Sequence, residues 1–180
     1  MKKQFVQKYF ICFMTYAIIG WCVEVCIAIF IHQYGFRNRG ILFGPYCPVY
    51  GFGALIFVFS LGWLMRKDGG FFFKLIKPLL VFLICALMAT VIELITSYIL
   101  EYFTGSWPWQ GYKHYKYNYQ SRIAPITSIG FGIGGVLGLY ILQPLLNRIL
   151  NKMKSHTIDI IFAVLLTTVV CDCIYTFILK

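Results

Sequence analysis

KPLLVFLICALMATVIELITSYILEYF, residues Lys77–Phe103, is an apolar run interrupted by only two acidic side chains, Glu93 and Glu101. An α-helix needs about 20 predominantly apolar residues to cross the hydrocarbon core of a bilayer. This run is longer than that, and the cost of placing a carboxylate in hydrocarbon means that such residues rarely face lipid. The stretch therefore predicts a membrane-spanning helix whose acidic side chains face protein.

The composition of the whole chain also indicates a protein that lies in a lipid bilayer. Of its 180 residues, 60% are hydrophobic and 12% are charged. A soluble domain of this size leaves much of its surface exposed and could not hide so many apolar side chains. Its 16 lysines and arginines against 6 acidic residues lie in short clusters between apolar runs, which is typical of membrane topology. We therefore expect a lipid bilayer as the partner and no nucleic acid.

Four further segments resemble the opening stretch in length and polarity. The first starts like a secretory signal, but its apolar run continues past a signal core and lacks a cleavage site, so we interpret it as a retained helix. Within a bilayer only helices satisfy their own backbone in an open-ended chain. We predict an all-α polytopic bundle forming a single membrane domain over residues 1–180, with spans at about 9–32, 48–65, 77–103, 123–146 and 158–179.

The orientation follows from the positive charges that flank the spans. Ten lysines and arginines lie on the side of the N-terminus and six, including Lys180, on the other. Because cytoplasmic loops carry the excess of positive charge, we predict a cytoplasmic N-terminus and an extracytoplasmic C-terminus.

Three carboxylates stand out within the apolar helices: Glu24 in the first, Glu93 in the third and Asp172 in the fifth. Each follows the polar residue at the cytoplasmic end of its helix by 16 positions (24 − 8, 93 − 77 and 172 − 156). At 1.5 Å per residue this is about 24 Å of rise, which predicts one acidic layer in the outer half of the membrane. Glu101 would lie about 12 Å further out.

Arg37, Arg39 and Arg122 lie just outside this layer and are its expected partners. We expect Arg39 to meet Glu24 or Glu93, with Arg37 nearer the surface. Two interpretations stay open. The pairs clamp helices together, or they line a hydrated outer-leaflet cavity that binds a ligand or exchanges protons and cations.

Outside the acidic layer, three features have simple structural interpretations. Gly130, Gly134 and Gly138 recur every four residues, a spacing that lets another helix approach closely. The aromatic and basic segment 104–122 is expected at headgroup level, or as a lid that binds a phosphate or carboxylate. The basic segment NRILNKMKSH, residues 147–156, is expected to contact anionic lipid or a cytosolic partner.

Three motifs give the chain a family resemblance: YAIIGWCVE (Tyr16–Glu24), NRGILFGPYCPVYGFGA (Asn38–Ala54) and VIELITSYILE (Val91–Glu101). Over roughly residues 9–146 the chain resembles the CmpB-type family of ABC-transporter type IV permeases, which are bacterial integral membrane proteins. The resemblance carries over Gly20, Trp21, Glu24, Asn38, Arg39, Gly40, Gly44, Pro45, Pro48, Tyr50, Gly51, Glu93, Glu101 and Arg122.

The chain departs from the family pattern in the loop before the fourth span. The family usually has Trp-Asp-Tyr and then Asn-x-x-Gly-Arg-Ile, whereas this sequence has WPWQGY and NYQSRI. Gln110 therefore replaces the aspartate and Ser121 replaces the glycine.

The resemblance implies a multi-pass subunit of a transport system in the bacterial plasma membrane, handling a small solute or ion. No ATP-binding motif occurs in the sequence, so an ATP-binding subunit would act in trans, and five spans are few for a pore, which favours a homo-oligomer. The alternative is a non-enzymatic binding or scaffold protein whose acid–arginine pairs are structural or bind a lipid headgroup. We expect no cofactor, no metal and no catalytic residue. A membrane enzyme acting on a lipid-linked substrate is the least favoured interpretation.

Overall fold

The computed structural model describes residues 2–31, 33, 35–107 and 109–179, and over these residues it is helical and contains no β-strand. The predicted end of the first span at His32, and the outer charge of Lys180, lie outside the described residues. The main helices are α1 (Lys2–Cys26), α2 (Pro48–Arg66), α3 (Phe71–Thr104), α4 (Pro125–Leu137), α5 (Gln143–Lys152) and α6 (Ser155–Ile174). π-Helical turns extend three of them, at Ile27–Ile31, Gly138–Leu142 and Tyr175–Leu179, and a short 3₁₀ helix occupies Gln110–His114.

The prediction of five membrane-spanning helices is confirmed. Continuous helices long and apolar enough to cross a bilayer are Lys3–Ile31, Pro48–Arg66, Phe71–Thr104, Pro125–Lys152 and Ser155–Leu179. The second begins at Pro48 as predicted, because proline has no N–H to lose and its φ suits the first turn of a helix. The third begins six residues earlier than predicted (77 − 71), since Lys74 and Lys77 are accommodated within it.

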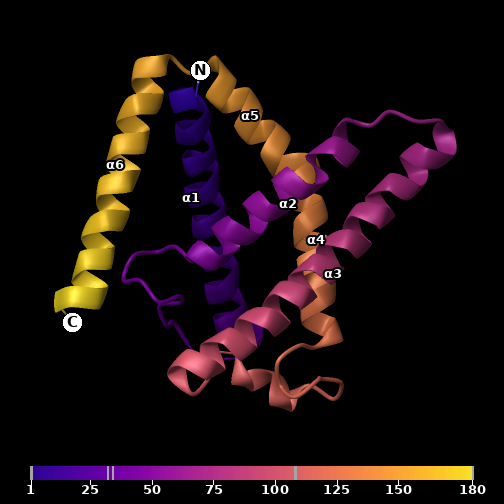
Figure 1. The fold of residues 1–180 in the computed structure, drawn as a ribbon, viewed down its shortest axis with the longest axis vertical. Coiled ribbons are helices and arrows are strands. Elements are labelled where there is room, and N and C mark those ends of the chain that lie inside the picture. The colour runs from indigo at the N-terminus through magenta and orange to yellow at the C-terminus, as the bar shows by residue number, and fades with distance from the viewer. Residues whose placement is uncertain (1, 32, 34, 108, 180) are drawn as a thin grey trace. The chain divides into compact units, whose positions relative to one another are not determined.

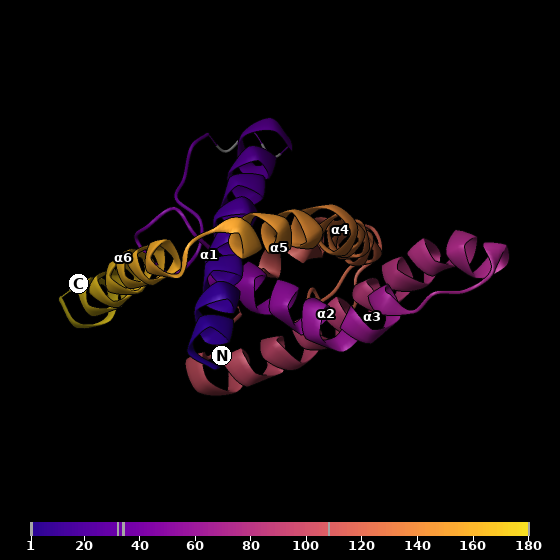
Figure 2. The same ribbon diagram turned by 90° about the horizontal axis from the view of Figure 1, so that it is seen from above.

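The chain divides into two compact units, Met1–Phe59 with Gln143–Lys180 (unit 1) and Ser60–Leu142 (unit 2). In unit 1, α1 contacts both α5 and α6, and the loop that precedes α2 lies between α1 and α6 (Figures 1 and 2). Leu42 and Tyr46 of this loop are buried in a cluster with Met14 and Ala17 of α1. The Cys47 N–H also donates to the Ala17 carbonyl at 2.9 Å, so the loop is fixed to the middle of α1.

Two glycines let α1 and the first part of α2 cross closely. A Cβ built on Gly20 would lie 2.3 Å from the Tyr50 ring, and one built on Gly51 would lie 2.6 Å from the Phe13 ring. Real Cβ atoms do not approach other heavy atoms this closely, so both positions require glycine. The GWCVE and VYG motifs are therefore two halves of one helix contact.

In unit 2, α3 and α4 lie against each other (Figure 1). The close approach uses Gly132, where a Cβ would lie 2.6 Å from the Phe82 ring. Beside it, the Thr90 and Ser128 hydroxyls hydrogen-bond at 2.6 Å. A Cβ on Gly130 or Gly134 would meet nothing described within 4 Å, so the packing of a further helix on the stripe of Gly130, Gly134 and Gly138 stays a prediction.

The α1–α2 contact leads to the first testable prediction. Gly20→Ala should lower the thermal unfolding midpoint of the detergent-solubilised protein, because overpacking at such a contact costs about 1–3 kcal/mol. Gly53→Ala is the matched control: it lies in the same helix as Tyr50, and its Cβ would meet nothing within 4 Å. We expect Gly53→Ala to leave the midpoint unchanged or raise it slightly. Equal midpoints for the two variants would contradict the close crossing.

Candidate functional site

Asp172 holds the loop of unit 1 in place. Its carboxylate accepts hydrogen bonds from the backbone N–H of Phe43 at 3.0 Å and of Gly44 at 2.8 Å. The hydroxyls of Tyr46 and, at 3.0 Å, Thr176 also donate to it. Burial and the bond to Asp172 raise the pKa of Tyr46, so this hydroxyl stays a donor at physiological pH. Gly44 is required here because a Cβ would lie 2.3 Å from the Tyr46 ring.

Asn38 closes the loop on its other side. The Trp21 indole N–H donates to Asn38 Oδ1 at 2.7 Å, and Asn38 Nδ2 donates to the Phe43 carbonyl at 2.8 Å. Between them Gly40 has a φ of +93°, a conformation that side chains other than glycine rarely adopt. Arg37 and Pro45 are exposed. Most of the family motif in this loop therefore shapes the backbone.

Glu24 and Arg39 lie around the end of this loop. The Tyr50 hydroxyl donates to Glu24 Oε1, and Tyr50 reaches it because its ring packs on Gly20, one helical turn before Glu24. Burial, with a smaller contribution from the Glu24 charge, raises the pKa of the Cys47 thiol to about 11, and the Arg39 charge opposes this rise. The charges of Glu24 and Arg39 therefore both affect this thiol. Arg39 Nε is buried and has no hydrogen-bond partner among the described residues.

In unit 2 the polar groups of α3 lie on one face. Thr90, Glu93, Ser97 and Glu101 are spaced at i, i+3, i+7 and i+11, which places them along one side of a helix. Each is hydrogen-bonded to a residue between Tyr112 and Ser128. This face is therefore a polar seam within a membrane-spanning helix.

Arg122 is enclosed by the outer end of this seam and is only 5% exposed. Its guanidinium donates to Glu101 Oε2 at 2.5 Å and to Ser97 Oγ at 3.2 Å. The rings of Tyr98 and Trp107 lie 4.1 and 4.0 Å from its Cζ, which adds cation–π attraction on a weakly hydrated cation. The predicted pairing of Arg122 with an acid thus involves Glu101.

Glu93 has a different environment from Glu101. The Tyr112 hydroxyl donates to Glu93 Oε1 at 2.8 Å. Its other oxygen, Oε2, is buried and has no hydrogen-bond partner among the described residues. A buried polar atom without a partner is costly, so this oxygen is a candidate position for a proton or a cation.

The loop before α4 is folded around Arg122. The indole N–H groups of Trp107 and Trp109 donate to the carbonyls of Ser121 and Arg122 at 3.2 and 2.9 Å. Loop residues Lys116–Tyr119 also line a cavity of about 430 Å³ with Thr90 and Ser128. The alternatives of an interface loop and a lid both stay predictions.

The tyrosines and the Lys3–Asp159 ion pair were not predicted from the sequence. Tyr46, Tyr50 and Tyr112 donate hydrogen bonds to Asp172, Glu24 and Glu93. The described ion pairs are Arg122–Glu101 and Lys3–Asp159, so none of them joins those three carboxylates to the arginines expected as their partners. One signal was available for Tyr50: Gly20 and Glu24 share a helix face at i, i+4, so a large residue docking on the glycine reaches the carboxylate.

The fold and these sites define a multi-pass helical membrane protein in which polar side chains inside the spans bond to other parts of the chain. A family model described as "Putative ABC-transporter type IV" matches residues 11–177. The chain belongs to this family, and it is a multi-pass protein of the bacterial plasma membrane. Neither a curated protein nor a solved structure matches the chain significantly.

Ser121 stands where the family usually has glycine, and its backbone explains that preference. Its φ is +57°, a left-handed conformation that costs about 1–2 kcal/mol for a residue with a side chain. The Asn118 side chain stabilises this turn, because its Oδ1 accepts a hydrogen bond from the Ser121 N–H at 2.9 Å. Asn118 and Arg122 match the family pattern, so Ser121 is a strained member of an otherwise intact turn.

This strain leads to the second prediction. Ser121→Gly should raise the unfolding midpoint in detergent, because glycine adopts a positive φ without steric cost. Ser106→Gly, in the same loop at an exposed residue with no positive φ, is the control and should not raise it. A midpoint for Ser121→Gly at or below that of the native protein would show that the turn is not strained.

Proposed function

We propose that the protein is the membrane-embedded subunit of a transport system, and that Glu24 and Arg39 bind the transported small solute or ion. One observation carries the proposal: the buried Arg39 Nε has no hydrogen-bond partner among the described residues, and Arg39, unlike Arg122, whose Nε is likewise unpartnered, forms no ion pair there. An arginine presents five N–H donors suited to carboxylate or phosphate oxygens. Such a donor is prepared for a polar ligand, and the charges of Arg39 and Glu24 both affect the pKa of Cys47.

The surroundings of Arg122 differ from those of Arg39. The Arg122 guanidinium has an acid, a hydroxyl and two aromatic rings around it, whereas no ion pair involves Arg39 in the described chain. We therefore assign a clamping role to the Arg122–Glu101 pair and a ligand-binding role to Arg39 and Glu24. Asp172 and Asn38 support that site by fixing its loop.

Glu93 supplies a second polar position in unit 2. Its bonded Oε1 and unpartnered Oε2 suit uptake of a proton or a cation during transport. If transport is driven by ATP hydrolysis, a separate ATP-binding subunit would supply the energy. A homo-oligomer would supply the further helices that a pathway through the membrane needs.

A second candidate function is a binding or scaffold protein without transport. The enclosed Arg122–Glu101 pair favours it, because this acid–arginine pair is satisfied within unit 2. Under this function Arg39 would take a lipid headgroup or simply brace the loop. Affinity purification from membranes separates the two: an ATP-binding subunit that travels with the protein supports transport, and its absence favours the scaffold.

Glu24→Gln is the third prediction and tests the ligand site. Glutamine keeps an oxygen that accepts the Tyr50 hydrogen bond and removes the charge, so the variant should fold. A panel of small charged solutes should contain at least one that raises the unfolding midpoint of the native protein, since a ligand at a hundred times its Kd stabilises by about 2.7 kcal/mol. That solute should not stabilise Glu24→Gln.

Asp68→Asn is the matched control, because it removes a carboxylate charge at an exposed turn. It should respond to the solute like the native protein. If Glu24→Gln fails to fold while Asp68→Asn folds, Glu24 is a clamp. If both variants keep the native response, the ligand binds elsewhere.

A further inference from the structure

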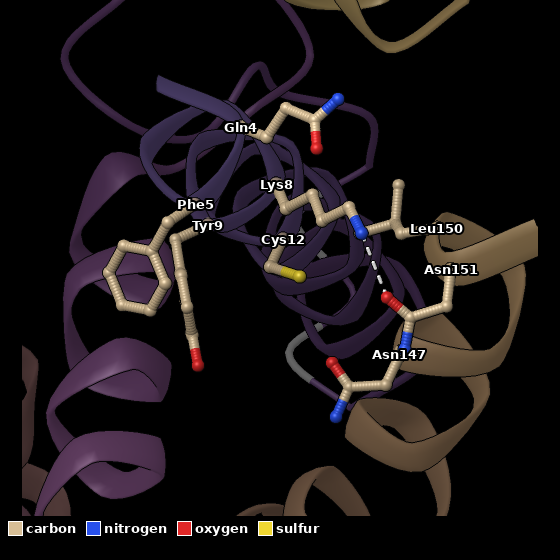
Figure 3. A pocket seen from close by; sticks show the side chains of 8 residues that line it. All are labelled: Gln4, Phe5, Lys8, Tyr9, Cys12, Asn147, Leu150 and Asn151. Atoms are coloured by element: carbon tan, nitrogen blue, oxygen red, sulfur yellow. Dashed lines mark hydrogen bonds between the residues drawn. The ribbon is translucent and has the colours of Figure 1, made fainter. Parts of the chain in front are cut away.

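Unit 1 contains a cavity of about 410 Å³ between the N-terminal turns of α1 and the C-terminal half of α5, at the predicted cytoplasmic end. Its walls are polar on one side and aromatic on another, and no lining residue is acidic (Figure 3). The lining residues are Gln4, Phe5, Lys8, Tyr9, Cys12, Asn147, Leu150 and Asn151.

The polar wall offers hydrogen-bond donors. Lys8 Nζ donates to Asn151 Oδ1 at 2.8 Å (Figure 3), and Gln143 Nε2 donates to Asn147 Oδ1 at 2.9 Å. Each asparagine oxygen accepts one of these bonds, and no described hydrogen bond uses the NH₂ group of either side chain. The Lys8 ammonium has two further N–H groups. The NH₂ groups of the two asparagines and the Lys8 ammonium can therefore donate hydrogen bonds to a bound anion.

The charge around the cavity is also positive. Arg148 and Lys152 are exposed on α5. The nearby carboxylate of Asp159 is already compensated, because Lys3 lies 3.1 Å from it and Gln7 Nε2 donates to it at 2.7 Å. No free carboxylate described here opposes an anion in the cavity.

The aromatic wall points to an anion with apolar chains. The rings of Phe5 and Tyr9 lie 4.5 Å apart between centroids, and Phe5 is 55% exposed. On α5, the exposed side chains Leu145 and Ile149 accompany the polar ones. Because α5 is the last part of the span Pro125–Lys152, these side chains lie where the span reaches the membrane–water interface, and lipid headgroups and the upper parts of acyl chains are both within reach.

We propose that this cavity binds the phosphate of an anionic phospholipid whose headgroup carries hydroxyls, such as phosphatidylglycerol. Lys8 balances the phosphate charge as a point charge, and the NH₂ groups of Asn147 and Asn151 donate to its oxygens. Gln4 Nε2 donates to Ser155 Oγ at 2.7 Å, which leaves the Gln4 oxygen to accept a headgroup hydroxyl. The acyl chains then run along Phe5 and Tyr9. This site does not depend on the solute site of Glu24 and Arg39.

Native mass spectrometry of the full-length protein in detergent tests the proposal, with phosphatidylglycerol and phosphatidylcholine as probes. Lys8→Gln should lower phosphatidylglycerol occupancy about fivefold, the effect of one basic residue near an anionic headgroup. Lys67→Gln removes the same charge from an exposed loop of unit 2, on the same predicted side of the membrane but outside the lining, and should change occupancy less than about twofold. Lys8→Arg should retain binding, and phosphatidylcholine should respond to none of these variants.

Asn147→Asp is a second variant, for use if Lys8→Gln does not fold. It places a carboxylate in the lining, so it should also lower phosphatidylglycerol occupancy. Equal losses in Lys8→Gln and Lys67→Gln, or equal occupancy by the two lipids, would overturn the proposal. So would displacement of the lipid by millimolar glycerol 3-phosphate, which would indicate a soluble phosphate ligand. Loss of a co-purifying protein from Lys8→Gln with phosphatidylglycerol retained would overturn it in favour of a protein-docking surface.

Discussion

The carboxylate of Asp172 accepts four hydrogen bonds, and the arrangement of unit 1 around the predicted outer site depends on them. Irregular backbone near a membrane needs partners from the protein, because hydrocarbon supplies none. Asp172 accepts hydrogen bonds from two consecutive N–H groups of the loop, and the Ala17 carbonyl accepts a third from the Cys47 N–H. The loop is therefore fixed to α6 and α1 at once. Without that anchoring, Arg39 would have no defined position relative to Glu24.

Arg122 and Arg39 illustrate two uses of the same side chain. Arg122 is enclosed by Glu101, Ser97 and two aromatic rings, so its charge is balanced within unit 2. Removing Glu101 would leave the buried Arg122 charge unpaired, which is strongly destabilising. The charges of Arg39 and Glu24 both affect the pKa of Cys47, and no described ion pair involves Arg39. The first arrangement is typical of a clamp and the second of a binding site.

Length and polarity were sufficient to predict the five spans, because an apolar run such as Lys77–Phe103 has one stable form in a bilayer. The start of α2 at Pro48 also followed from the chemistry of one residue. The hydrogen-bond partners of Glu24 and Glu93 could not be predicted from the sequence. Tyr50 and Tyr112 resemble ordinary interface aromatics in the sequence, and their pairing with Glu24 and Glu93 depends on helix rotation and loop path, which packing decides.

A comparison of Arg39→Gln with Arg122→Gln tests the division between clamp and ligand site most directly. Each variant removes one positive charge, and the unfolding midpoint is measured with and without a solute that stabilises the native protein. We predict that Arg122→Gln loses about 1.5–3 kcal/mol of stability, the contribution of hydrogen bonds to a charged group, because the Glu101 side chain that remains is 42% exposed. Arg39→Gln should keep the native midpoint without solute and lose the response to solute. An Arg39→Gln variant as unstable as Arg122→Gln, or one that still responds to the solute, would contradict the account.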